Sequence, residues 1–243
     1  MDIINQVIDN ENKYALYNGD CVEVVSNLKD NSIDFSIFSP PFASLYTYSN
    51  SDRDMGNCGS DEEFFGQFSF LVEQLYRVLK PGRLIAIHCM NLTASKAREG
   101  YIGIRGDLIR KFQDYGFIYH MSRQGLPDYL LIMRKPGVNE KPISGEFTHF
   151  VGDELMNNFI EHERDDERHF FPLQLDVVES AMQLWSKPGD TVLTPFLGIG
   201  TEAYTAVKMG RKAIGVELKP SYFNLACRNL EQATKHQYDM FSE

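Results

Sequence analysis

Short runs of apolar residues alternate with longer amphipathic stretches through most of the 243 residues. This alternation is typical of strands that are each followed by a helix, and it predicts an α/β fold with a largely parallel sheet. Strands are expected over residues 15–17, 33–38, 83–89, 117–121, 128–134, 191–193 and 213–217. Helices are expected over residues 22–28, 61–79, 106–115, 173–185, 201–209 and 222–234.

One segment departs from this alternation. Residues 136–170 are polar and acidic and are interrupted by glycine and proline. They are expected to form a long connection or a small subdomain. The charged run EHERDDER, with His162 and His169 in or beside it, is expected to be solvated, so no metal site is predicted. One domain is expected over residues 1–243, with halves at 1–135 and 171–243 joined by this segment.

Three features indicate the compartment. No apolar run approaches the roughly 20 residues of a membrane span. The first residues, MDIINQVIDNENK, carry acids and amides where an export signal would be basic and then apolar. The four cysteines lie far apart with no CxxC pair, which argues against a zinc knuckle or a disulfide framework. A cytoplasmic protein without a membrane partner is therefore expected.

Charge is distributed unevenly along the chain. The net charge of -10 argues against a general nucleic-acid binder. Residues 77–135, however, hold 11 Lys/Arg against 4 Asp/Glu, whereas the parts on either side are acidic. This basic stretch is either a solvated face or a local cleft for a polyanion.

A glycine loop lies near the end of the chain, in DTVLTPFLGIGTEAYTAVKMGRKAIGVE (190–217). Gly198 and Gly200 allow close backbone approach at the mouth of a helix. Glu217 ends the following strand, 19 residues after Gly198, a spacing that suits a carboxylate accepting the hydroxyls of a ribose. The loop lacks GK[ST], which excludes a P-loop, and it lacks the third glycine of a dinucleotide fingerprint. The stretch predicts a nucleoside-containing cofactor.

A second motif follows the strand at 33–38, and it reads Ser39-Pro40-Pro41-Phe42. Together with TPFLGIGT (194–201), it resembles the amino-methyltransferases of DNA. That family uses a [DNS]-P-P-[YFW] motif for catalysis and a loop of the form D-P-F-x-G-S-G-T for S-adenosylmethionine. The catalytic motif comes first here, which is similar to the permuted β group, and the length is similar to phage-borne members.

The resemblance implies a Rossmann-like fold with a seven-stranded, mostly parallel sheet and one antiparallel strand. It implies S-adenosylmethionine as cofactor and double-stranded DNA as substrate. By the same resemblance Asp20 contacts the adenine and Glu217 holds the ribose. The other implied cofactor contacts are Thr194, Pro195, Phe196, Gly198, Gly200, Thr201, Phe171 and Leu173. Asp20 is also expected to be a helix N-cap, and both roles can coexist.

Two positions depart from the family pattern. Thr194 stands where the family loop begins with Asp, and Ile199 replaces the usual Ser. Loss of the carboxylate weakens the hold on the charged amino group of the cofactor unless another acid compensates. Neither change removes the backbone geometry of the loop.

Chemistry explains the proline motif. An exocyclic amino nitrogen is a poor nucleophile because its lone pair is delocalised into the base. The Ser39 hydroxyl and the Pro40 carbonyl are expected to accept its two hydrogens and so favour a localised lone pair. The two prolines keep the turn rigid and without N–H donors, and Phe42 is expected to stack on the base. The base must first be flipped out of the duplex.

DNA contacts are expected from basic and aromatic side chains in segments that the strand pattern assigns mainly to loops. The candidates are Tyr46, Arg53, Lys96, Arg98, Arg105 and Arg123. His88, near a strand end, is expected to be a core histidine.

Several alternatives stay open. Ser39 slightly favours cytosine N4 over adenine N6 as the methylated atom. A non-catalytic module that binds S-adenosylmethionine is a second function, supported by Thr194. Methylation of RNA or of a protein glutamine is a third, and Ser39 argues mildly against the protein substrate. The short recognition regions also leave a homodimer open.

Overall fold

The computed structural model describes residues 5–41, 49–90, 92–93, 101–102, 104–124, 128–140 and 173–239. Its strands are β1 (Asn5–Ile8), β2 (Tyr14–Asn18), β3 (Ile33–Phe38), β4 (Leu79–Met90), β5 (Leu92–Thr93), β6 (Tyr101–Ile102), β7 (Ile118–Gln124), β8 (Asp128–Arg134), β9 (Thr191–Thr194) and β10 (Lys212–Glu217). Its helices are α1 (Cys21–Ser26), the 3-10 turn η1 (Met55–Asn57), α2 (Asp61–Val78), α3 (Ile104–Asp114), α4 (Leu175–Trp185), α5 (Thr201–Lys208) and α6 (Pro220–Asp239). None of these helices is long and apolar enough to cross a membrane.

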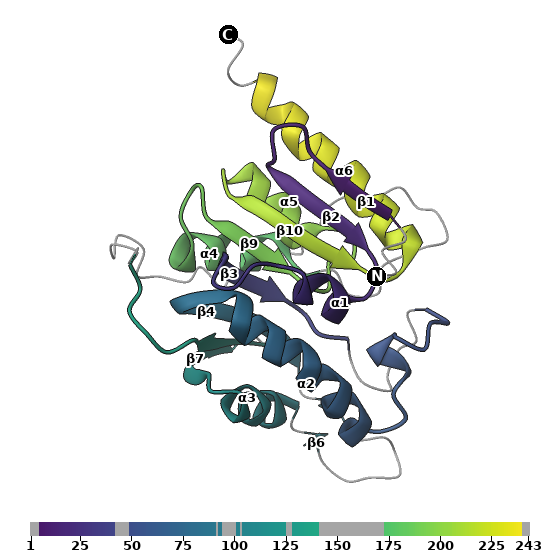
Figure 1. Ribbon diagram of the computed structural model, residues 1–243, viewed down its shortest axis with the longest axis vertical. Helices are drawn as coiled ribbons and strands as arrows, with labels where there is room; N and C mark the ends of the chain where they lie inside the picture. The colour runs from purple at the N-terminus through teal and green to yellow at the C-terminus, as the bar shows by residue number, and fades with distance from the viewer. Residues whose placement is uncertain are drawn as a thin grey trace.

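Eight strands form one sheet in the order β1-β2-β10-β9-β3-β4-β8-β7 (Figure 1). The five central strands from β2 to β4 pair in parallel, whereas β8 is antiparallel to β4 and β7 is antiparallel to β8. One core cluster joins the sheet to α1, α2 and α3, and a second joins it to α4, α5 and α6. Because both faces of the sheet are covered, all six residues of β3 are buried.

The α/β fold with a mostly parallel sheet is confirmed, but the sheet has eight strands where seven were expected. The additional strand is β1, which pairs antiparallel with β2 at the edge. Its residues are mostly exposed, so its sequence carries no apolar alternation that could have announced it. Without β1 the sheet has seven strands, of which only β8 runs against the rest.

Strand β4 begins four residues earlier than its apolar run predicted. Leu79 already pairs with Ile33, and the chain stays extended through Lys80-Pro81-Gly82. Gly82 has a φ of +75°, and a Cβ there would lie 2.5 Å from the backbone nitrogen of Asn139. A glycine at position 82 therefore permits close passage of the chain that follows β8.

Buried charges are paired at the amino ends of the central strands. Arg83 of β4 binds Asp190, and its Nε donates to the backbone oxygen of Asp34 at 2.6 Å. Asp34 also accepts from Lys80 Nζ at 2.6 Å and from the Thr191 N–H at 3.0 Å. These contacts tie β3, β4 and β9 together.

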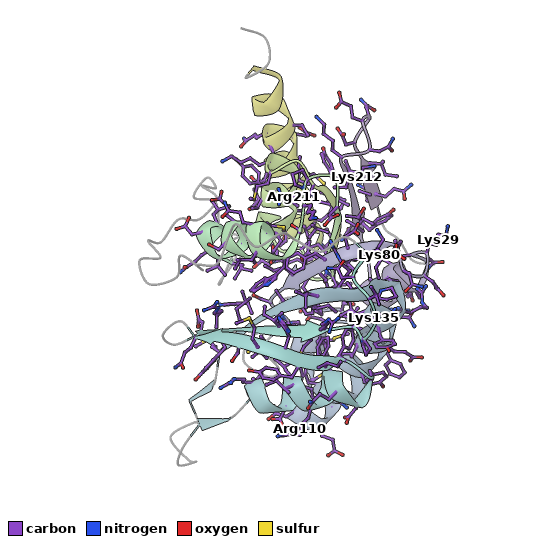
Figure 2. All side chains as sticks on the ribbon, turned by 90° about the vertical axis from the view of Figure 1, so that its left-hand side faces the viewer. Lys29, Lys80, Arg110, Lys135, Arg211 and Lys212 are labelled. Carbon is purple, nitrogen blue, oxygen red and sulfur yellow. The ribbon has the colours of Figure 1, made fainter. Side chains whose placement is uncertain are left out.

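Several basic residues of 77–135 make structural hydrogen bonds at the amino ends of the central strands. Lys135 Nζ donates to Asn31 Oδ1 at 2.8 Å and to the Leu79 carbonyl at 2.7 Å. Arg77 donates to the Leu28 carbonyl at 2.7 Å. Figure 2 labels Lys80, Lys135 and Lys212, and Lys212 is the first residue of β10. Part of the basic excess is therefore structural and lies away from the carboxyl ends of the strands.

Candidate active site

A cleft of about 930 Å³, counted to its open mouth, lies at the carboxyl ends of the central parallel strands. Neighbouring strands β3 and β9 send the chain in opposite directions, β3 through α2 to β4 and β9 through α5 to β10. Open α/β sheets bind ligands at such a reversal, because the loops diverge and leave a crevice.

The cleft brings together most of the described residues that the sequence singled out. Those that line it are Asp20, Ser39, Pro40, Pro41, Arg53, Leu173, Pro195, Phe196, Gly198, Thr201 and Glu217. Thr194 and Gly200 do not line it. Phe42, Tyr46, Lys96, Arg98 and Phe171 lie outside the described residues. Two motifs about 155 residues apart therefore share one cavity.

The proline motif leaves the sheet at the cleft floor. Phe38 ends β3 fully buried, Pro40 is buried, and Ser39 between them is half-buried. Ser39 Oγ lies 3.0 Å from Nδ1 of His88. His88 was expected to be only a core histidine, and this contact places it directly behind the motif.

The glycine loop is held by contacts on both sides. The Leu197 N–H donates to the Val216 carbonyl at 2.8 Å, and Asn229 Nδ2 of α6 donates to the Ile199 carbonyl at 2.8 Å. Gly200 is the N-cap of α5 with a φ of +94°. A Cβ there would lie 3.1 Å from side-chain atoms of α6. Gly200 thus serves the turn and the packing of α5 against α6.

Glu217 ends β10 and faces the cleft. Its two carboxylate oxygens accept from the Gly198 N–H at 2.8 Å and the Lys219 N–H at 2.9 Å. Burial raises the pKa of Glu217 to about 7, although these two backbone donors act in the opposite direction. Across the cleft, Asp20 caps α1 by accepting from the Glu23 N–H at 2.9 Å. The expected N-cap role of Asp20 is confirmed.

Two acids of the cleft were missed by the sequence analysis. Glu202 stands in the first turn of α5 and is 4% exposed. Burial, with a smaller contribution from the charge of Glu217, raises the pKa of Glu202 to about 8. Asp54 caps η1 and accepts from the Ser49 N–H at 2.6 Å. Acids beside a helix start are usually caps or dipole partners, so their sequence positions alone did not mark them.

Aromatic residues support the floor of the cleft. The Phe196 ring lies 5.7 Å from the ring of Phe38 and 6.4 Å from that of Phe68, measured between centroids. Phe68 in turn contacts Phe64 and Phe112 in the core between α2 and α3. The loop residue that lines the cleft is therefore anchored in a rigid core.

The basic residues proposed for DNA contacts separate into two groups. Arg53 lines the cleft and pairs with Glu23 of α1. Arg105 instead donates to Ser122 Oγ at 3.0 Å and lies 4.9 Å over the ring of Tyr129. Arg123 is half-buried on β7, at the edge of the sheet. Arg105 and Arg123 are thus not brought to the cleft.

The sequence is similar to those of known DNA methyltransferases. Residues 128–228 match the family model described as DNA methylase. The type II methyltransferase M.BglII of Bacillus subtilis is 23% identical over 252 residues, which cover 87% of this chain and 67% of the relative. The type II methyltransferase M.BamHI of Bacillus amyloliquefaciens is also 23% identical, over 84% of this chain and 54% of the relative. The chain thus spans between about half and two thirds of these relatives.

Solved structures are similar over nearly the whole chain. TTHA0409 of Thermus thermophilus, complexed with S-adenosyl-L-methionine, has a TM-score of 0.67 and 25% identity, covering 90% of this chain and 95% of that one. The cytosine-N4-specific PvuII DNA methyltransferase has a TM-score of 0.64 and 18% identity, covering 92% and 90%. At that identity the second likeness concerns the fold alone. The permuted class and the phage origin stay predictions.

Proposed function

Since the chain is a relative of the N6-adenine and N4-cytosine DNA methyltransferases, we propose that it methylates the exocyclic amino group of a DNA base. The methyl donor is S-adenosylmethionine, which is bound in the TTHA0409 structure. The observation that carries the proposal is the shared cleft, lined both by Ser39-Pro40-Pro41 and by the loop around Gly198. A methyl transfer needs its donor and acceptor sites within one enclosed space.

The side chains of the cleft fit this cofactor. S-adenosylmethionine carries a sulfonium and an ammonium. Two acids line the cleft, buried Glu202 and half-buried Glu217, and neither forms an ion pair among the described residues. Thr201 Oγ1 is also buried and has no hydrogen-bond partner among the residues that the structure describes. Glu217 holds the ribose hydroxyls with its remaining lone pairs. Glu202 faces the positive charges and replaces the acid that is missing at Thr194.

The chain's own groups prepare the acceptor base. The bound cofactor supplies an electrophilic methyl group. The Ser39 hydroxyl and the Pro40 carbonyl accept the two amino hydrogens of the base, so that the nitrogen lone pair points away from them. Positioning of this kind supplies a large part of a displacement barrier without any strongly shifted base. One amino proton is released once the nitrogen is methylated.

The substrate is duplex DNA with its target base flipped out, because a stacked base cannot reach Ser39 at the cleft floor. Arg53 lies at the cleft wall and contacts the DNA backbone or the flipped nucleotide. Ser39 in the first motif position favours cytosine N4, and adenine N6 is the alternative. A homodimer stays a prediction.

Expression in a host that lacks amino-methylated bases tests this function. We expect N4-methylcytosine or N6-methyladenine in host DNA by nucleoside mass spectrometry, and long-read sequencing gives the sequence context. Ser39→Ala removes an acceptor and lowers methylation strongly, while calorimetry shows unchanged binding of S-adenosylmethionine. Ser69→Ala on α2, outside the cleft, is the matched control and leaves methylation unchanged.

Two outcomes would refute the proposed function. A chain that binds S-adenosylmethionine but transfers no labelled methyl group to duplex DNA would be a non-catalytic module. Transfer to RNA in preference to DNA in a competition assay would also refute the proposed substrate.

A further inference from the structure

We propose that His88 and Asp128 are positioning residues that hold the Ser39 hydroxyl as a hydrogen-bond acceptor for the target base. Ser39 Oγ lies 3.0 Å from His88 Nδ1, and His88 Nε2 lies 3.3 Å from Asp128 Oδ2. The inference rests on the proposed function, because it assigns roles within the acceptor site of that reaction.

Strand pairing brings these three groups together. Phe38 of β3 is paired with Ile87 of β4, so Ser39 follows directly beside His88. On the other side of β4, the antiparallel strand β8 starts at Asp128, which is paired with Met90. His88 and Met90 point to the same face of the sheet because side chains alternate along a strand. The row Ser39, His88, Asp128 thus crosses three rigid neighbouring strands.

The proposal assigns a direction to the hydrogen bond between Ser39 and His88. The side chain of Asp128 is 39% exposed, so its carboxylate is solvated and acts as an acceptor. We assign to His88 the neutral tautomer with its hydrogen on Nε2, the nitrogen that faces Asp128, so that Nδ1 presents a bare lone pair to Ser39. The Ser39 hydroxyl must donate to that lone pair. Its own lone pairs are then left for other donors.

This arrangement answers a chemical problem of serine in the motif. A carboxylate or amide oxygen always accepts, whereas a hydroxyl rotates and can point its hydrogen at the target nitrogen. A hydrogen pointed there would compete for the nitrogen lone pair that attacks the methyl group. With His88 behind it, Ser39 lines the cleft as an acceptor only. His88 and Asp128 act through Ser39 and need not touch the base.

Steady-state and single-turnover rates test the assignment, on a duplex oligonucleotide that carries the methylated context found by sequencing. We expect His88→Ala to lower kcat by at least about tenfold, as loss of a supporting hydrogen bond commonly does in an active site. KM for DNA and the affinity for S-adenosylmethionine change little. His88→Asn recovers most of the rate because its amide oxygen stands near the former Nδ1. His120→Ala, an exposed histidine of β7, is the control.

A double-mutant cycle separates positioning from a merely structural role. In a Ser39→Asn background the amide oxygen accepts directly, so His88→Ala costs less than about threefold there. The same loss in both backgrounds, or equal rates for His88→Ala and His88→Asn, would overturn the inference. A wild-type chain without methyltransferase activity would instead count against the proposed function, and an active wild type with an indifferent His88 counts against this inference alone.

Discussion

Replacement of Glu202 by glutamine should stabilise the protein free of ligand while weakening its cleft. The carboxyl is 4% exposed, and burial raises its pKa from 4.5 to about 8. Between those values the folded state holds a proton that the unfolded state releases, so stability falls as pH rises. At pH 7 this amounts to roughly 2.5 pH units at 1.36 kcal/mol each, or about 3 kcal/mol. The glutamine side chain is neutral at every pH and avoids this loss.

The effect of Glu202→Gln on stability should depend on pH. The difference in unfolding free energy between Glu202→Gln and wild type should grow by about 1.4 kcal/mol for each pH unit from 5 to 7. At pH 7 it corresponds to a rise in melting temperature of roughly 6–12 °C for a domain of this size. Urea unfolding at pH 5, 6 and 7 measures it. Part of the wild-type slope persists in the variant, because Glu217 also has a raised pKa, about 7.

Glu231→Gln, an exposed glutamate of α6, is the matched control and should shift stability little at any pH. A Glu202→Gln variant that is less stable than wild type, or whose difference from wild type is the same at pH 5 and pH 7, would refute the reasoning. Either outcome would mean that the buried carboxyl is ionised and already has a partner in the folded chain.

Three further results are expected. Binding of S-adenosylmethionine at pH 6.5 should release protons, because the positive charge of the ligand favours the ionised form of Glu202. Calorimetry in buffers of different ionisation enthalpy measures the number of protons released. A binding enthalpy that is the same in all buffers would contradict the expected proton release. Gly200→Ala should cost about 1–3 kcal/mol because of its φ of +94°, whereas Gly66→Ala on open helix surface should stabilise by up to about 1 kcal/mol, both by urea unfolding. Asp190→Asn should cost up to about 3–5 kcal/mol by removing the carboxylate nearest to buried Arg83, which then keeps the more distant carboxylate of Asp34, and an unchanged denaturation midpoint would argue against the Arg83–Asp190 pair.

The sequence predicted the parts of the site that depend on local backbone geometry. Ser39-Pro40-Pro41 and Gly198 are residue types with restricted or unusual backbone angles, so their spacing carries information without a tertiary context. The apolar runs of β3 and β8 were placed with the bounds that the structure gives them, because buried strands require continuous apolar residues. Edge strand β1 has no such requirement and was missed.

The parts that failed to follow from sequence depend on which way a side chain faces. Arg105 and Arg123 belong to a basic stretch, but Arg105 contacts Ser122 and the ring of Tyr129, and Arg123 lies half-buried on edge strand β7. Glu202 looks like an ordinary first-turn acid, and only burial distinguishes it. His88 lies between Ser39 and Asp128 only because β3 and β8 flank β4 in this register. Pairing partners and burial are tertiary properties, which a single sequence does not display.

The two ends of the sheet treat buried charge in opposite ways. At the amino ends, Arg83 lies between Asp34 and Asp190, so each buried charge has a partner within the chain. At the carboxyl ends, Glu202 is buried and Glu217 is half-buried, and both have raised pKa values. Neither forms an ion pair among the described residues, although the charge of Lys219 acts to lower the pKa of Glu217. For Glu202 a neutral side chain would stabilise the free protein, whereas Glu217 also accepts the Gly198 and Lys219 N–H groups. Their retention is explained if a cationic ligand completes the cleft, because the energy that they cost the free protein is then returned on binding.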